Sequence, residues 1–370
     1  RPLAGLALAA VAAVPLSAQQ KGGTDDFGPY EVVAGWMKPV KEGFLEKGSS
    51  VFAESPDRIL VGTSLEFPVP SRPSGPGFTA PAGSSNRALV TVLDRDGNVK
   101  EVWTQWENLI NMPHYITESP YDPDKAVWVV SRETDQIFKF SNDGKKLLMT
   151  LGVARSEMPK NAQGQPVTLS DSTHFGRPAS LAFLPDGSFY VADGYTNRRV
   201  VKFDKNGKYL FEWGRPGTGP GEFAPVGEVH SIAIDANHRI YVGDRGNKRI
   251  QIFDENGKYL DEWDNIQGPS DIHVSSDGFV WVVSGVGNRI VKFDPKNGHR
   301  ETYWGMYGTF PGAFDNPHFM SVDRDGNLYV AIFTNQKVGI EKYVPRAGAD
   351  RSRLVAPDLK LDRKSTRLNS

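Results

Sequence analysis

The chain has 370 residues, no cysteine and a formal net charge of −1 at pH 7. Its 43 Lys and Arg residues are scattered among 44 Asp and Glu residues, so the sequence has no electrostatic footprint for nucleic acid or an anionic membrane. This composition favours small-molecule or peptide partners and a monomer whose fold does not depend on disulfides.

Residues 1–18 have the pattern of a secretory signal peptide. The stretch begins with Arg1, continues as an apolar run rich in Leu and Ala, and ends in small residues at Ala18. It is too short to be a good membrane span, and no other segment is long and apolar enough. We therefore expect a secreted or periplasmic protein, with residues 19–29 as a linker.

A repeating pair of apolar runs follows from residue 30 to residue 346. In five segments, the residue 13 positions after the start of the first run lies in a second apolar run. A sixth segment has the same two runs with a longer connection. The six segments begin at Ser49, His114, Ala179, His230, Ser270 and His318.

Each complete unit contains four predicted strands joined by turns of the Asp-x-x-Gly or Asn-Gly type, which supply the positive φ that tight hairpins require. Six such units predict an all-β fold, a six-bladed β-propeller. The last unit is one strand short, and residues 30–36 can supply that strand and close the ring. Asp94-x-Asp96-Gly and Asp323-x-Asp325-Gly are better interpreted as turns than as calcium loops.

The long connections are all expected on one rim of the ring, because the other rim has only tight turns. They are residues 65–86, 154–177, 214–229 and 304–317, and the first of them is a possible lid. Residues 347–370 continue no repeat, and we expect a polar tail that is disordered or a cloning scar.

Histidine alternates with a small residue at the position that opens the units. In a six-bladed ring this places His114, His230 and His318 about a third of a turn apart around the channel mouth. Three neutral imidazoles around an open fourth position are typical of a catalytic zinc site. The alternative is that each histidine only begins a strand. His174 is a less favoured candidate for a fourth ligand. The remaining histidines do not stand at the residue that opens a unit.

The same rim receives two loops, residues 193–199 and 244–249. These loops and the histidine motifs resemble consecutive blades of peptidyl-α-hydroxyglycine α-amidating lyase (peptidylamidoglycolate lyase), an NHL-repeat six-bladed propeller family. The resemblance spans about residues 105–345. The matching segments are PH at 113–114, VADGYTNRRVVKF at 191–203, WG at 213–214, VHSIA at 229–233, DR at 244–245, RIQ at 249–251 and PH at 317–318.

The resemblance implies a zinc ion held by His114, His230 and His318, with Tyr195 as the general base and Arg245 as a further active-site residue. That family cleaves the C–N bond of a C-terminal α-hydroxyglycine and releases glyoxylate and a peptide amide. The residue types suit this reaction, because a metal would acidify the substrate hydroxyl and a nearby phenolate would take its proton.

Two alternatives stay open for the residues outside the histidine set. Tyr195 is either the base or an exposed loop aromatic, and Arg245 is either an active-site residue or the ion-pair partner of Asp193 or Asp244.

The sequence departs from the family pattern at three places. Residues 61–67 lack the substrate-binding arginine of the first blade, Asn316 replaces a methionine, and Phe319 replaces the aspartate that binds a structural calcium. Calcium is therefore less expected than zinc. Arg72, Arg87 and Arg132 are candidates to replace the missing arginine. The 370 residues contain no segment that resembles a copper monooxygenase, so we expect the lyase to act alone or on another carbinolamide.

The leading hypothesis is thus an exported zinc-dependent lyase. The second is a non-enzymatic NHL-repeat propeller that binds a peptide, glycan or protein on its looped rim. A lactonase is third, because such sites favour acidic ligands around calcium.

Overall fold

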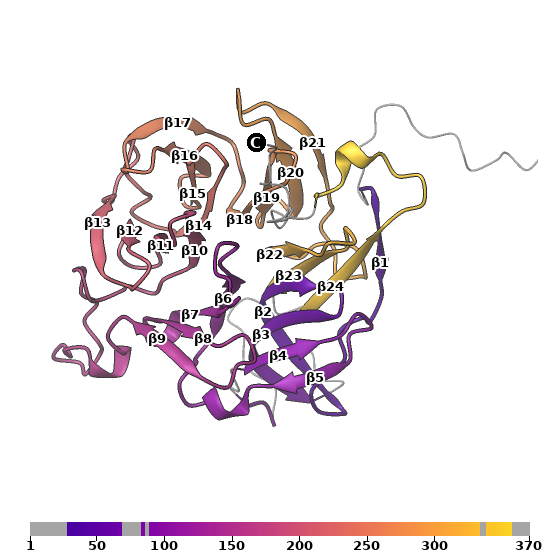
Figure 1. Cartoon of the computed structure of the whole chain (residues 1–370), viewed down its shortest axis with the longest axis horizontal. Helices are drawn as coiled ribbons and strands as arrows, with labels where there is room; N and C mark the ends of the chain where they lie inside the picture. The colour runs from indigo at the N-terminus through magenta and orange to yellow at the C-terminus, as the bar shows by residue number, and fades with distance from the viewer. Residues whose placement is uncertain (1–27, 69–82, 86–88, 334–337, 357–370) are drawn as a thin grey trace, which may run out of the picture.

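The computed structural model describes residues 28–68, 83–85, 89–333 and 338–356, which form six four-stranded antiparallel sheets. The sheets surround a common axis with their first strands innermost (Figure 1). The expected all-β, six-bladed propeller is confirmed. The expected signal peptide and most of the possible lid, including Arg72, lie outside the described residues, as does Arg87.

Strand order follows the chain in blades 1 to 5, and blade 6 combines both ends of it. Blades 1 and 2 contain β2 (Phe44–Ser55), β3 (Arg58–Pro68), β4 (Leu89–Leu93), β5 (Val99–Val102), β6 (Pro113–Glu118), β7 (Val127–Ser131), β8 (Gln136–Phe140) and β9 (Leu147–Leu151). Blades 3 and 4 contain β10 (Ser180–Phe183), β11 (Phe189–Asp193), β12 (Arg199–Phe203), β13 (Tyr209–Trp213), β14 (Val229–Ile234), β15 (Ile240–Asp244), β16 (Arg249–Phe253) and β17 (Tyr259–Trp263). Blades 5 and 6 contain β18 (Pro269–Val274), β19 (Val280–Ser284), β20 (Arg289–Phe293), β21 (Arg300–Trp304), β22 (Pro317–Val322), β23 (Leu328–Phe333), β24 (Val338–Pro345) and β1 (Tyr30–Val33). Short 3₁₀ turns occur at η1 (Thr104–Trp106), η2 (Arg132–Thr134), η3 (Arg155–Glu157) and η4 (Arg351–Arg353).

The N-terminal strand closes the ring. β1 pairs antiparallel with β24, from Tyr30 opposite Pro345 to Val33 opposite Lys342. It ends three residues before the expected position, because Gly35 has a φ of 65° and the Trp36 amide donates to the Val33 carbonyl, which turns the chain. The outer strand of blade 6 therefore comes from the opposite end of the sequence.

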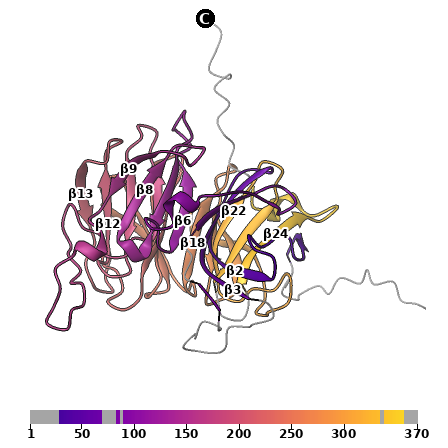
Figure 2. The ribbon, with the colours of Figure 1, turned by 90° about the horizontal axis from the view of Figure 1, so that it is seen from below.

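The hydrophobic core lies between neighbouring blades, where the β-branched and aromatic side chains of one sheet pack on the next. Figure 2 shows the sheets side by side, with their strands running between the two faces of the ring. The structure thus offers a rigid support for loops at one rim.

The tight turns at the other rim are closed by aspartates. The Asp94 carboxylate accepts hydrogen bonds from the amides of Asp96 and Asn98, and Asp323 accepts from Asp325 and Asn327 in the same way. These carboxylates satisfy the backbone amides of hairpin turns, as the sequence predicts.

The chain beyond the last strand also packs on the propeller, as far as it is described. Val355 is buried and its amide donates to the Tyr30 hydroxyl, while Lys292 donates to the Ser352 carbonyl. Residues 357–370 lie outside the described residues. Among the described residues, none of the helices has the length and hydropathy of a membrane span.

Candidate metal centre

A distortion of the innermost strands aims the three histidines at the axis. The register of β6 against β7 shifts between Pro113 and Tyr115, so His114 is an extra residue in the strand. Register shifts also fall at His230 in β14 and at His318 in β22. Such β-bulges redirect a side chain that regular alternation would place elsewhere. The bulges could not be recognised in the sequence.

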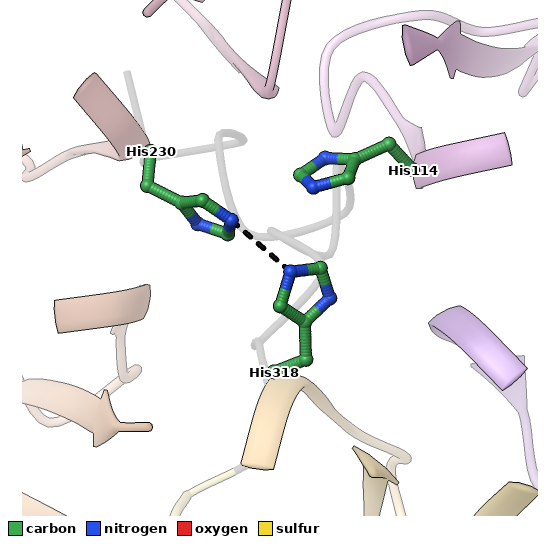
Figure 3. Close-up of side chains that lie close together, drawn as sticks. All are labelled: His114, His230 and His318. Atoms are coloured by element: carbon green, nitrogen blue, oxygen red, sulfur yellow. Dashed lines mark hydrogen bonds between the residues drawn. The ribbon is translucent and has the colours of Figure 1, made fainter. Parts of the chain in front are cut away.

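The three imidazoles point toward one another at the channel mouth (Figure 3). One nitrogen from each ring lies within 4.8 Å of the corresponding nitrogens of the other two rings, and the Nε2 atoms of His230 and His318 are 3.1 Å apart. All three side chains are buried. The three histidines therefore converge in the structure, as their alternating positions in the sequence predict.

Each imidazole is held by the small residue that opens the next blade. The Nδ1 atom of His114 lies 2.8 Å from the carbonyl oxygen of Ala179. The same contact joins His230 to Ser270 at 2.6 Å and His318 to Ser49 at 2.9 Å. The carbonyl groups of these small residues thus set the orientation of the rings.

These contacts also fix the tautomer. A carbonyl oxygen only accepts, so Nδ1 carries the proton and each neutral ring directs an Nε2 lone pair into the hollow. Burial lowers the pKa of His114 and His230 well below 6.5 and lowers the pKa of His318 to about 3. The rings are therefore neutral at pH 7, and protonation does not relieve the repulsion between their lone pairs.

The donor set suits a divalent cation. Ligands at about 2.0–2.1 Å in a tetrahedral site lie about 3.3 Å from each other, which is close to the 3.1 Å between Nε2 of His230 and Nε2 of His318. The trio as a whole spans up to 4.8 Å, so the widest pair would close further around an ion. Three neutral imidazoles suit zinc and other borderline transition metals better than calcium, which prefers oxygen ligands. Among the described residues, this is the one group with the geometry to hold a metal.

Tyr195 lies directly over the histidines and is partly buried. Its hydroxyl oxygen is 3.0 Å from Nε2 of both His114 and His230. Burial raises the pKa of Tyr195, while the positive charges of Arg132 and Arg245 lower it. The reading of Tyr195 as a freely exposed loop aromatic is therefore wrong.

Arg245 is near the same hollow, since its charge lowers the pKa of all three histidines. It does not pair with either expected aspartate, because Asp193 pairs with Arg199 at 2.9 Å and Asp244 with Arg249 at 3.0 Å. The nearest acid recorded for Arg245 is Glu228, at 3.7 Å.

Phe319 forms an apolar wall next to the histidines. Its buried ring lies 4.3 Å from the His318 ring centroid, and it stacks on His230 at 5.4 Å with an interplanar angle of 22°. Where the resemblance leads one to expect a calcium-binding carboxylate, this chain thus has a hydrocarbon ring without ligand atoms.

The other histidines belong to the surrounding structure. His174 pairs with Asp171 at 2.9 Å and is not part of the metal-binding group. His238 lies in a turn with a φ of 60°, 3.3 Å from Glu255. His299 is exposed in a turn, and His273 lies in β18.

Comparison with known proteins agrees with the fold. The family model DUF5128, described as a 6-bladed β-propeller, matches residues 167–288. A solved structure from Bacteroides thetaiotaomicron, of a protein of unknown function, superposes with a TM-score of 0.55 at 12% identity, covering 86% of this chain and 73% of that one. At that identity it shows the fold alone.

Three curated relatives carry more specific names. Peptidyl-alpha-hydroxyglycine alpha-amidating lyase 2 of Drosophila melanogaster is 30% identical over 71% of this chain and 62% of its own length. The NHL repeat-containing protein 3 of Homo sapiens is 29% identical over 78% of this chain and 85% of its own. Peptidyl-glycine alpha-amidating monooxygenase of Mus musculus is 33% identical over 42% of this chain, and the chain spans only 15% of that protein. The chain is therefore a six-bladed β-propeller with homology to the peptidyl-α-hydroxyglycine amidating lyases and to the NHL repeat proteins.

Proposed function

We propose that this protein is an exported, zinc-dependent lyase of the peptidyl-α-hydroxyglycine type, which cleaves a carbinolamide C–N bond to an amide and glyoxylate. The observation that carries the proposal is the set of three neutral imidazoles with a tyrosine hydroxyl 3.0 Å from two of them. Similarity to named lyases supports the reaction class. We further propose that it acts as a monomer on a peptide or small molecule, without nucleic acid or membrane.

In this proposal His114, His230 and His318 would hold the zinc ion through their Nε2 atoms. When bound, zinc supplies Lewis acidity that lowers the pKa of a substrate hydroxyl. Tyr195 is the group placed to take that proton, because its oxygen lies 3.0 Å from Nε2 of both His114 and His230. Arg245 would stabilise the negative charge of the substrate.

The proposed reaction is an elimination without redox change. Burial disfavours the phenolate of Tyr195, so this role relies on the opposing positive charges of Arg132 and Arg245 and of a bound metal ion. The phenolate removes the hydroxyl proton, the C–O bond becomes a carbonyl, and the C–N bond breaks. The electron pair of that bond remains on the amide nitrogen, which receives a proton, so Tyr195 can return the one that it took. The products are an amide and glyoxylate.

The proposal is tested by metal analysis and glyoxylate release from a model peptidyl-α-hydroxyglycine. We expect about one zinc per chain, and loss of zinc and activity in His318→Ala, because removing one of three ligands weakens metal binding more than about 10-fold. His299→Ala is the matched control, since this histidine is exposed in a turn. Equal zinc content and activity in the two variants would contradict the assignment.

A second candidate is a non-enzymatic propeller that binds a peptide, glycan or protein on its looped rim. It is favoured by the similarity to NHL repeat-containing protein 3 and by exposed apolar side chains on the connections of that rim, among them Val226 and Val286. Purified protein without zinc and without glyoxylate release would support it. Zinc without glyoxylate release would instead indicate an enzyme for a different substrate.

A further inference from the structure

Two arginines lie against Tyr195, namely Arg198 and Arg132, and the second was also a candidate to replace the missing arginine of the first blade. The first, Arg198, binds the backbone of the tyrosine loop. Its Nη1 donates to the carbonyls of Gly194 at 3.2 Å and Tyr195 at 2.7 Å. Its Nε and Nη2 donate to Ala224 at 2.9 Å and Pro225 at 3.2 Å, in the connection between blades 3 and 4.

A guanidinium cation is here taken partly out of water and bound by neutral groups. Burial lowers the pKa of Arg198, and its recorded hydrogen bonds go to four neutral carbonyls. The planar fork of donors is what allows one side chain to join two loops. Arg198 therefore fixes the backbone from which the Tyr195 side chain extends.

The second arginine, Arg132, covers the ring itself. Its guanidinium carbon lies 4.3 Å from the centroid of the Tyr195 ring, a cation–π contact from blade 2 to blade 3. Arg132 is oriented by Glu133 at 2.8 Å, and Glu133 also pairs with Arg177 at 3.0 Å. The Arg177 carbonyl in turn accepts from the Tyr195 amide at 3.4 Å.

We propose that Arg132 and Arg198 are positioning residues, which together hold the Tyr195 hydroxyl over the histidine nitrogens. Arg198 restrains the backbone and Arg132 restrains rotation of the ring, so the hydroxyl stays 3.0 Å from His114 and His230. A loop side chain would otherwise sample other rotamers, and misplacement of a reacting group by about 1 Å can cost about 100-fold in rate. The inference rests on the proposed function in the role given to Tyr195 and in the metal site formed by the three histidines.

The first test is spectroscopic and needs no catalysis. Cobalt(II) is bound to the protein in place of zinc, and the visible absorption band, which depends on the geometry around the metal, is compared among variants. We expect Arg132→Met and Arg198→Met to shift the band in the direction that Tyr195→Phe shifts it. Arg215→Met is the matched control, because this arginine is exposed and pairs with Glu222. Bands identical to the control in both variants would overturn the proposal, even if the protein has no lyase activity.

The second test applies once glyoxylate release has been observed. We expect each variant to lower kcat about 10- to 100-fold with little change in KM and with full metal content. Arg132→Lys should recover part of kcat because it keeps the cation over the ring, whereas Arg198→Lys should not, because an ammonium group lacks the planar fork.

A double-variant cycle separates positioning from general stability. In the Tyr195→Phe background, Arg132→Met should lower kcat little further, because the group that it positions is already gone. Full additivity of the two losses would overturn the proposal. Thermal unfolding of each variant shows whether it folds. If Arg198→Met does not fold, the Arg132 variants alone test the proposal.

Discussion

At the residue scale, the behaviour of the three histidines is decided by backbone carbonyls. Each Nδ1 donates its proton to the backbone carbonyl of Ala179, Ser270 or Ser49, so each Nε2 faces the hollow as an acceptor. The Tyr195 hydroxyl has one proton to donate to these three acceptors, so the remaining repulsion between lone pairs favours a metal ion. The same arrangement should make the metal-free protein less stable at low pH. A histidine in the unfolded chain binds a proton more readily than the buried histidine does, so acid favours the unfolded state.

The first prediction concerns the stability of the metal-free protein against pH. The folded pKa values of these histidines are lowered from 6.5, for His318 to about 3, so the unfolded chain binds more protons between these limits. The free energy of unfolding should therefore fall as pH falls below about 6.5, by about 1.4 kcal/mol per pH unit for each histidine. Urea unfolding at several pH values in the presence of a chelator measures this slope.

Three buried acids act in the opposite sense. Burial raises the pKa of Asp135 and Asp193, and it raises the pKa of Asp271 from 3.8 to about 8. The folded state therefore keeps protons that the unfolded state releases, and their stabilising effect is lost as pH rises. The buried acids are present in both the wild type and His318→Gln, so their contribution cancels when the pH slopes of the two proteins are compared. The slope of the variant should be smaller by about 1.4 kcal/mol per pH unit, and an unchanged slope would contradict the lowered pKa of His318.

The second prediction concerns the addition of metal. Zinc that binds only the folded protein should raise the free energy of unfolding by about 2.7 kcal/mol at a free concentration 100 times its Kd. The urea midpoint at pH 7 should therefore rise with zinc in the wild type and in His299→Ala. It should not rise in His318→Gln, which lacks one donor of the trio.

At the scale of the elements, a tryptophan in an outer strand packs on a turn glycine of the next blade. A Cβ atom on Gly257 would lie 2.8 Å from the Trp213 ring, and one on Gly298 would lie 2.5 Å from Trp263. Because these glycines also have positive φ, both the backbone and the packing between blades require them. The blades are thus locked at the outer edge as well as in the core.

The third prediction separates these two requirements. Gly257→Ala should lower the free energy of unfolding by more than the roughly 1 kcal/mol expected from positive φ alone, because it also displaces Trp213. Gly278→Ala is the matched control, with a φ of 84° and no atom within 4 Å of the added Cβ. Equal losses in chemical denaturation would show that the contact between blades contributes nothing.

At the scale of the whole molecule, the ring depends on a short strand from the far end of the sequence. Tyr30 in β1 is buried, packs on Trp304 at 5.5 Å, and accepts a hydrogen bond from the Val355 amide at 2.9 Å. A single side chain thereby joins β1 to the last strand of blade 5 and to the chain that follows blade 6.

The fourth prediction tests this closure. Tyr30→Ala should lower the free energy of unfolding by about 3–5 kcal/mol, the usual cost of removing a buried aromatic side chain. Val33→Ala, in the same strand but 37% exposed, should cost much less. Hydrogen exchange should show faster opening of β24 in Tyr30→Ala. A cost no larger than that of Val33→Ala would mean that closure at this strand is unimportant for stability.

The sequence by itself determined the number of blades, the strands within each and the positions of the three histidines. These features follow from local chemistry, since alternating apolar residues and Asp-Gly or Asn-Gly turns act over a few neighbouring residues. The expectation that His114, His230 and His318 converge needed only the symmetry of the ring. The closing strand was also predictable, although Gly35 ends it earlier than expected.

Only the tertiary structure decided how the site is assembled. The carbonyl that orients His318 belongs to Ser49, 269 residues away in the chain, and Arg132 reaches Tyr195 from another blade. A bulge, a tautomer or the choice among several arginines depends on which groups meet in space and exclude water, and no local pattern encodes that. For the same reason, the aspartates expected for Arg245 were already paired with Arg199 and Arg249.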